Sequence, residues 1–122
     1  MTGDELAALL ARDEVVQLLD VRSSAEYQGS GGYPCDPRQG HIPGARHVEV
    51  SLLFAGPGTP ADAEEIRRLV GSPAGAEVVV YCHSGSRSAL AAMALRSAGY
   101  RARNYPGSWH EWSRHSDLPV AT

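Results

Sequence analysis

Short runs of aliphatic residues mark the strands that the chain predicts. Residues 15–21 read Val-Val-Gln-Leu-Leu-Asp-Val, and residues 77–81 contain three consecutive valines that lead directly to Cys82. Runs that are apolar on both faces and rich in β-branched residues are typical of inner strands in a parallel sheet. We expect two further strands, at residues 46–50 and 101–105.

Helical patterns lie between these strands. Thr2 and Glu5 have the spacing of a capping box ahead of an apolar leucine face, which predicts an opening helix that ends near Asp13. A serine at position 23 or 24 is expected to cap a brief helix that reaches Tyr27.

Two longer helices are expected in the second half of the chain. Thr59 and Pro60 are typical of an N-cap followed by the first helical residue, and this helix should end before Gly71. The next helix is expected over residues 87–98, with Gly99 just beyond its C-terminus. Its sheet-facing side chains are expected to include Leu90, Met93 and Ala94.

Together these patterns predict a single α/β domain over residues 1–122. Strands that alternate with helices imply a parallel sheet covered on both faces. Residues 28–40 are rich in turn-forming residues, and a loop of this length is often functional. A final short helix is expected to begin within residues 107–113. In parallel sheets ligands bind beyond the carboxyl ends of the strands, where Cys82 falls.

The composition is that of an ordinary globular domain and excludes several function classes. Of the 122 residues, 43% are hydrophobic and 20% charged, and the net charge is −3. This charge gives no general attraction for nucleic acid or an anionic membrane, so we expect neither partner. The first residues do not resemble a secretory signal, and no apolar run is long enough to span a bilayer. Two cysteines are too few for a disulfide framework, and we expect a cytoplasmic protein.

The stretch from Cys82 to Ser88 carries the strongest chemical signal. Cys82 ends a buried strand and precedes a helix start, where backbone N–H groups lack partners and carry partial positive charge. An anion binds readily there, and the same field should draw the pKa of the thiol below its free value of about 8.5. The alternative is a buried structural cysteine followed by an ordinary capped helix.

The other residues of this stretch suit an anion site that contains a thiol. Arg87 offers a planar cation whose fork matches sulfonate, phosphate or carboxylate oxygens. Gly85 lets the backbone turn where a side chain would obstruct it. His83 either sets donor preference or faces solvent, and both interpretations remain open. The hydroxyl donors of the stretch are Ser84, Ser86 and Ser88.

Other polar residues have competing interpretations. Asp20 and Arg22 are either an acid and an anion clamp or an ion pair that holds a strand end, and we favour the ion pair. Cys35 is either a resolving cysteine for Cys82 or a surface thiol, and the absence of C-x-x-C spacing favours the surface thiol. No metal site is expected, because the remaining histidines lack ligand spacing with either cysteine. They are His41, His47, His110 and His115.

In four segments and in their order, the sequence resembles the rhodanese (sulfurtransferase) family. It looks most like the catalytic C-terminal half of tandem two-domain sulfurtransferases. The resemblance covers nearly the whole chain, and no single segment carries it alone. The segments are Leu19-Asp20-Val21-Arg22 with Glu26-Tyr27, Gly40-His41-Ile42-Pro43-Gly44-Ala45, Cys82 to Arg87, and Gly107-Ser108-Trp109 with Glu111-Trp112.

The resemblance implies a fold and a reaction. The fold is rhodanese-like α/β, with a central parallel sheet of about five strands and helices on both faces. In the implied reaction the Cys82 thiolate takes a sulfane sulfur from thiosulfate or a persulfide, and the resulting cysteine persulfide passes it to cyanide or a thiol. The loop N–H groups and Arg87 would hold the donor oxygens. No metal or organic cofactor is implied, and we expect a monomer or a weak dimer.

The length of the Cys82 loop and the residue at position 26 indicate which kind of sulfur donor the chain uses. Rhodanese loops have the form Cys-x4-Arg, which this chain has, whereas related phosphatases have one more residue, so sulfur transfer is favoured over a phosphatase or arsenate reductase. Mercaptopyruvate-using relatives have arginine at the position of Glu26, and its absence here favours thiosulfate or a persulfide. By loose analogy with the same relatives, Arg38 is a candidate second cation over the site. A non-catalytic binding or regulatory module of this fold is the main alternative, although such modules commonly lack the cysteine.

Overall fold

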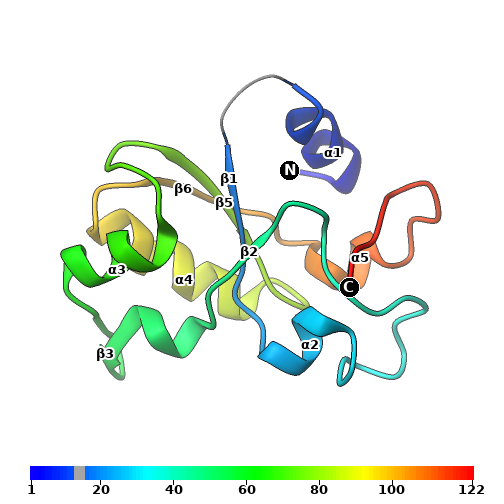
Figure 1. Cartoon of the computed structure of the whole chain (residues 1–122), viewed down its shortest axis with the longest axis horizontal. Coiled ribbons are helices and arrows are strands. Elements are labelled where there is room, and N and C mark those ends of the chain that lie inside the picture. Colours follow the sequence, from blue (N-terminus) through cyan, green and yellow to red (C-terminus); the bar gives the residue numbers. More distant parts are fainter. Residues whose placement is uncertain (13–15) are drawn as a thin grey trace.

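A four-stranded parallel sheet forms the centre of the chain (Figure 1). The computed structural model describes residues 1–12 and 16–122, so the expected helix end at Asp13 and the first expected strand residue, Val15, lie outside it. Each neighbouring pair in the sheet is parallel, which confirms the predicted α/β class, with four strands in the described part against the expected five or so. In spatial order the strands are β2 (Arg46–His47), β1 (Gln17–Asp20), β5 (Glu77–Tyr81) and β6 (Arg101–Asn104).

Helices cover both faces of this sheet. One face packs against α3, α4 and a short 3-10 helix, η1, and the other packs against α1 and α5 (Figure 1). None of the helices in the described ranges is long and apolar enough to cross a membrane. The helices are α1 (Gly3–Leu10), α2 (Ser24–Gln28), η1 (Val50–Leu53), α3 (Ala63–Val70), α4 (Ser86–Ser97) and α5 (Ser108–Trp112).

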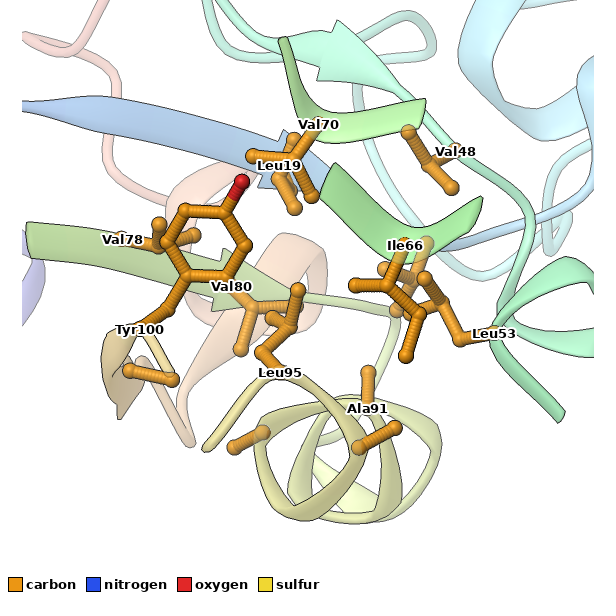
Figure 2. Packing of buried hydrophobic residues seen from close by; sticks show 14 of the residues in the cluster. Leu19, Val48, Leu53, Ile66, Val70, Val78, Val80, Ala91, Leu95 and Tyr100 are labelled. Carbon is orange, nitrogen blue, oxygen red and sulfur yellow. The ribbon is translucent and has the colours of Figure 1, made fainter. Parts of the chain in front are cut away.

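The middle strand β5 contributes to two separate apolar clusters, because its successive side chains point to opposite faces. Val78 and Val80 pack with Leu95 of α4, as Figure 2 shows. Val79 and Tyr81 pack on the other face with the two tryptophans of α5. A strand buried on both sides must be apolar throughout, and each fully buried large aliphatic side chain contributes about 1.5–3 kcal/mol.

The expected start of the third helix is wrong. Thr59–Pro60 forms strand β4, which pairs antiparallel with β3 (Phe54–Gly56), and α3 begins at Ala63 with Asp62 as its N-cap. Proline is tolerated in a two-stranded ladder of this kind because both strands are edges. The pairing of the two strands therefore overrides the local helix-start signal, while Gly71 ends the helix as predicted, in the left-handed conformation.

The expected inner face of α4 is wrong for two of its residues. Leu90 and Met93 are 54% and 63% exposed, whereas Ala94 is buried as expected, together with Ala91 and Leu95. The buried face is turned by about one residue from the expected one. Its small side chains let the helix approach β5 and β6 closely. Gly99 follows the helix with a positive φ of 94°, as expected.

A buried ion pair holds the end of β1. Arg22 donates to both carboxylate oxygens of Asp20, at 2.8–3.1 Å, and neither side chain is more than 1% exposed. The hydroxyl of Tyr81 donates to Asp20 over 2.7 Å and accepts from the backbone N–H of Ile42. The Arg22 guanidinium also lies 4.9 Å from the centre of the Trp109 ring. These contacts confirm the structural interpretation of Asp20 and Arg22.

Replacing Arg22 is expected to destabilise the fold strongly. Arg22→Ala leaves the buried Asp20 carboxylate without its cation, and breaking a buried pair in this way costs about 3–5 kcal/mol. Urea denaturation should show this loss. Arg68→Ala, which breaks an exposed pair with Glu65, is the matched control and should change stability little. Equal effects of the two substitutions would contradict a structural role for the buried pair.

Candidate active site

The loop between β5 and α4 is docked onto the start of α5. The backbone N–H of Trp109 donates to the carbonyl of Cys82, and that of His110 donates to the carbonyl of His83, both over 2.9 Å. These bonds satisfy the carbonyls of the loop from outside it. The backbone N–H of Cys82 donates to the hydroxyl of Ser108, and that of Gly85 donates to the sulfur of Cys82.

The Cys82 sulfur lies in a ring of hydrogen-bond donors. Its Sγ accepts from the backbone N–H of Gly85 at 3.1 Å and from the hydroxyl of Ser88 at 3.3 Å. The backbone N–H groups of Ser84 and Ser88 also favour the charged form of this sulfur and so lower the pKa of Cys82. The residue is fully buried. Donors arranged around one sulfur are suited to stabilising a thiolate or a persulfide anion.

These hydrogen-bond donors lower the pKa of the Cys82 thiol by more than burial raises it. Burial alone raises the pKa of Cys82, because it disfavours the charged form. The hydrogen bonds from the Ser88 side chain and from the backbone of Ser88, Gly85 and Ser84 lower it, and the net pKa lies below the usual value. The direction agrees with the expectation from the sequence. Neutral dipoles, rather than Arg87, make the main contribution.

The loop needs glycine at position 85. Gly85 has φ 98°, in the left-handed region that favours glycine. A Cβ atom there would lie 2.8 Å from the carbonyl oxygen of Pro106. Asn104 donates to the Gly85 carbonyl at 3.3 Å, and the Ser88 hydroxyl, whose one proton faces both this carbonyl and the Cys82 sulfur, lies 3.2 Å from it. The predicted role of this glycine in turning the backbone therefore has a specific steric reason.

Ser108 is a site residue that the sequence analysis did not identify. Its hydroxyl accepts from the backbone N–H of Cys82 at 3.1 Å and donates to the carbonyl of Tyr105 at 2.8 Å. Its φ of 52° is positive, an uncommon conformation for a residue other than glycine. In the sequence, Ser108 stood out only as part of the segment Gly107–Trp109, which resembles the rhodanese family but did not indicate a role for this serine.

Arg87 is paired with Glu26, a contact that the sequence did not predict. Its guanidinium donates to both carboxylate oxygens of Glu26, at 2.8 and 3.1 Å. Burial raises the pKa of Glu26, but the bonds from Arg87 and the capping box with Ser23 lower it overall. The hydrogen bonds from Arg87 to Glu26 are the main reason that the pKa of Arg87 is raised. The side chain of Arg87 is 32% exposed, so part of it also faces solvent.

The other residues expected around the loop differ in position. His83 is largely buried, with its ring stacked on that of Tyr33 at 3.7 Å. Ser86 is exposed at the first residue of α4. Ser84 is exposed and lines a hollow of about 670 Å³. Other residues that line this hollow are Pro106, Gly107, His110, Glu111, Arg114 and His115.

The structure gives Arg38 a different place from the one expected. Instead of presenting a second cation to the loop, its guanidinium donates to four backbone carbonyls at and beyond the end of α5. A helix C-terminus leaves carbonyls without partners, and a guanidinium with five N–H groups satisfies several at once. The accepting carbonyls are those of Trp112, Ser113, His115 and Leu118.

Comparisons with known proteins agree on one family. The rhodanese-like domain family matches residues 2–115. The chain is 37% identical over 115 residues to the sulfur carrier protein TtuD of Thermus thermophilus, covering 85% of this chain and 40% of that protein. It is 38% identical over 108 residues to the putative thiosulfate sulfurtransferase SseB of Mycobacterium tuberculosis, covering 86% of this chain and 38% of SseB. The chain thus spans about two fifths of the length of these relatives.

Solved structures show the same fold. A probable thiosulfate sulfurtransferase superposes on all of this chain with a TM-score of 0.80 and 43% identity, and 47% of that protein is covered. A variant of EanB that carries a cysteine persulfide, in a tetrahedral intermediate state with ergothioneine, superposes with a TM-score of 0.84 and 27% identity. That match covers all of this chain and 31% of EanB. On its fold and its sequence alike, the chain belongs to the rhodanese-like domain family.

Proposed function

We propose that the chain is a thiosulfate-type sulfurtransferase that carries the transferred sulfur as a persulfide on Cys82. The observation that carries the proposal is the ring of donors around a thiol whose pKa is lowered. Relatives named as thiosulfate sulfurtransferases and as a sulfur carrier support sulfur transfer in general. A structural relative that carries a cysteine persulfide supports the proposed intermediate.

The proposed reaction has two displacements. The Cys82 thiolate attacks the outer sulfur of thiosulfate, the sulfur–sulfur bond of the donor breaks, and sulfite leaves with the bonding electron pair. A nucleophile then attacks the terminal sulfur of the persulfide and regenerates the thiolate. Cyanide would yield thiocyanate, and a thiol would yield a new persulfide. The loop N–H groups stay fixed throughout, so they stabilise the anionic sulfur at each stage without reorganising.

Arg87 is proposed to bind the oxygens of the donor while Glu26 fixes its orientation. The two hydrogen bonds to Glu26 occupy part of the guanidinium fork, and the remaining N–H groups and the exposed part of the side chain are available to an oxyanion. Because Glu26 offsets the charge of Arg87, the site should bind a small sulfonate-like donor without holding the sulfite product tightly. His83, Ser84, Ser86 and the Gly85 backbone line the same loop and are proposed as secondary donor contacts.

The name of the relative TtuD suggests a second candidate function, that of a sulfur carrier. A carrier would form the same persulfide on Cys82 but deliver the sulfur to another protein rather than to a small molecule. The hollow of about 670 Å³ beside Ser84 has room for a small acceptor next to the loop. The two functions differ only in the second step, so an experiment can distinguish them by what removes the sulfur after the persulfide has formed.

Thiosulfate is expected to add one sulfur atom to the protein. Intact mass measurement after incubation should show this gain in the wild type and in Cys35→Ser, and no gain in Cys82→Ser. Subsequent cyanide should remove the sulfur and release thiocyanate in a sulfurtransferase. If no sulfane donor adds sulfur to the wild type, the proposal fails. If the sulfur is added but resists cyanide and small thiols, the carrier function is favoured.

Removing the Ser88 hydroxyl should make Cys82 less acidic. Ser88→Ala deletes a donor to the sulfur, so the pKa of Cys82 rises and the pH at which it becomes reactive moves upward. A hydrogen bond to a charged group contributes about 1.5 kcal/mol or more, so alkylation at neutral pH should slow about tenfold.

The measurement is the rate of iodoacetamide alkylation against pH, in a Cys35→Ser background so that Cys82 is the thiol followed. Ser97→Ala, at the exposed last residue of α4, is the matched control and should leave the profile unchanged. An unchanged profile in Ser88→Ala would show that the backbone donors alone set the acidity.

Arg87→Ala is expected to reduce thiosulfate use about 100-fold, the usual effect of losing one preorganised oxyanion contact. It also leaves Glu26 facing the anionic donor. Use of a neutral alkyl persulfide should fall much less. The double variant Glu26→Gln/Arg87→Ala should recover part of the loss, because the uncompensated carboxylate is gone. Steady-state kinetics with both donors provide the test, and equal losses for the two donors would rule out an anion-holding role.

A further inference from the structure

A second cluster of reactive side chains lies beside the active loop, the segment from Cys82 to Gly85 that joins β5 to α4. Cys35 and Asp36 come from the long loop at residues 28–40, and His83 follows Cys82 directly. One potential ligand atom from each of the three lies within 4.8 Å of the other two. Proposed sulfur transfer on Cys82 uses neither Cys35 nor Asp36, so their proximity to His83 needs a separate explanation.

Two atoms of this cluster are buried without a hydrogen-bond partner. The side chain of Asp36 is fully buried, and its Oδ1 accepts from Arg114 at 2.7 Å. Its Oδ2 lies 3.0 Å from Nε2 of His83 but is not aligned with it for a hydrogen bond. Within the described part of the chain, neither Oδ2 nor Nε2 has another partner. Buried polar atoms without a hydrogen-bond partner are rare, and an ion that binds between them is one of the explanations for such atoms.

Neighbouring groups hold the cluster in place. The ring of Tyr33 stacks on His83 with an angle of 10° between the planes, and the ring of His110 meets it edge-on at 5.5 Å. Arg114 donates to the backbone carbonyl of Cys35 at 3.0 Å as well as to Asp36. Such outer contacts orient metal ligands and are a regular feature of metal sites.

We propose that Cys35, Asp36 and His83 form a binding site for Zn²⁺. A thiolate, a carboxylate and an imidazole are the three donor types that this ion takes in proteins. Bonds of about 2.0–2.3 Å place the ligand atoms of a tetrahedral site roughly 3.3–3.8 Å apart. Asp36 Oδ2 and His83 Nε2 are already 3.0 Å apart, so any approach to the ion falls mainly to the sulfur of Cys35. Cys35 is exposed, so its side chain is free to make this movement.

The charges of the cluster suit a dication. The Cys35 thiolate and the Asp36 carboxylate bring two negative charges, and the Arg114 guanidinium offsets one of them. Binding of the ion displaces the proton of the Cys35 thiol into solvent and forms the metal–sulfur bond. Three protein ligands leave a fourth position for water, or for His110, whose Nδ1 lies 3.8 Å from Asp36 Oδ1.

A bound ion would tie the long loop to the active loop. His83 would be fixed as a ligand and would no longer be available to a sulfur donor, while the neighbouring Cys82 would keep its own ring of donors. The site therefore offers a link between metal supply and the geometry of the active loop that does not depend on Cys82 as a ligand.

Zinc titration of the Cys82→Ser protein tests the site without interference from the other thiol. Competition with a chromophoric chelator should show one Zn²⁺ per chain, and Co²⁺ should give the absorption of a thiolate–cobalt bond. Adding Cys35→Ser or His83→Ala should weaken binding by about 100-fold or more, since even outer-shell changes typically cost 10–100-fold. The control is His115→Ala, which removes a partly exposed histidine paired with Asp4.

Several outcomes would overturn the proposal. They are the absence of saturable one-to-one binding in Cys82→Ser, an unchanged affinity after Cys35→Ser, or an equal loss in His115→Ala. Circular dichroism identifies a variant that fails to fold. A second measurement avoids substitutions at the site: Zn²⁺ should slow alkylation of Cys35 in the Cys82→Ser protein at least tenfold, and an unchanged rate would also refute the site.

Discussion

The conformation of the active loop depends on two sets of hydrogen bonds made by its backbone, one from its carbonyls to α5 and one from its N–H groups to the sulfur of Cys82. The carbonyls of Cys82 and His83 accept from the first turn of α5, and the N–H of Gly85 donates to the sulfur. A buried carbonyl without a partner costs about 1–3 kcal/mol, so the start of α5 is a condition for this arrangement. The left-handed φ of Gly85 and the positive φ of Ser108 are the local conformations that make the two segments fit.

The position of that loop depends in turn on the ends of the strands. The ion pair of Asp20 and Arg22, joined by Tyr81, fixes the carboxyl ends of β1 and β5 relative to each other. The contact of Arg22 with the Trp109 ring extends this buried network to α5. The buried polar residues at the strand ends therefore hold the start of the loop in place. Cys82, the reactive residue, directly follows Tyr81 of this network.

Local signals predicted the parts of the fold that are determined by neighbouring residues. The bounds of β5, the turn at Gly85 and the placing of the Ser88 hydroxyl beside the sulfur follow from a few consecutive positions, whereas Ser84 and Ser86 are exposed. The pairing of Glu26 with Arg87, the place of Arg38 at the end of α5, and the meeting of Cys35 with His83 join segments far apart in the chain. Nothing in the composition of one segment indicates its partner. The buried face of α4 was misjudged for a related reason: apolarity favoured Leu90 and Met93, while close approach to the sheet favours alanine.

Different groups lower the pKa of Cys82 and offer a cation to the donor, two tasks that a single arginine would otherwise combine. Neutral donors lower the pKa of Cys82, whereas the cation at Arg87 is offset by Glu26 and lies at the partly exposed edge of the site. A thiolate stabilised by fixed dipoles keeps its environment when a donor arrives or sulfite departs, because no counterion has to be displaced. In the proposed reaction, the pair of Glu26 and Arg87 would then select the donor. A pair with little net charge discriminates by geometry more than by charge, which would suit the proposed reaction, in which an anionic donor binds and an anionic product leaves in each cycle.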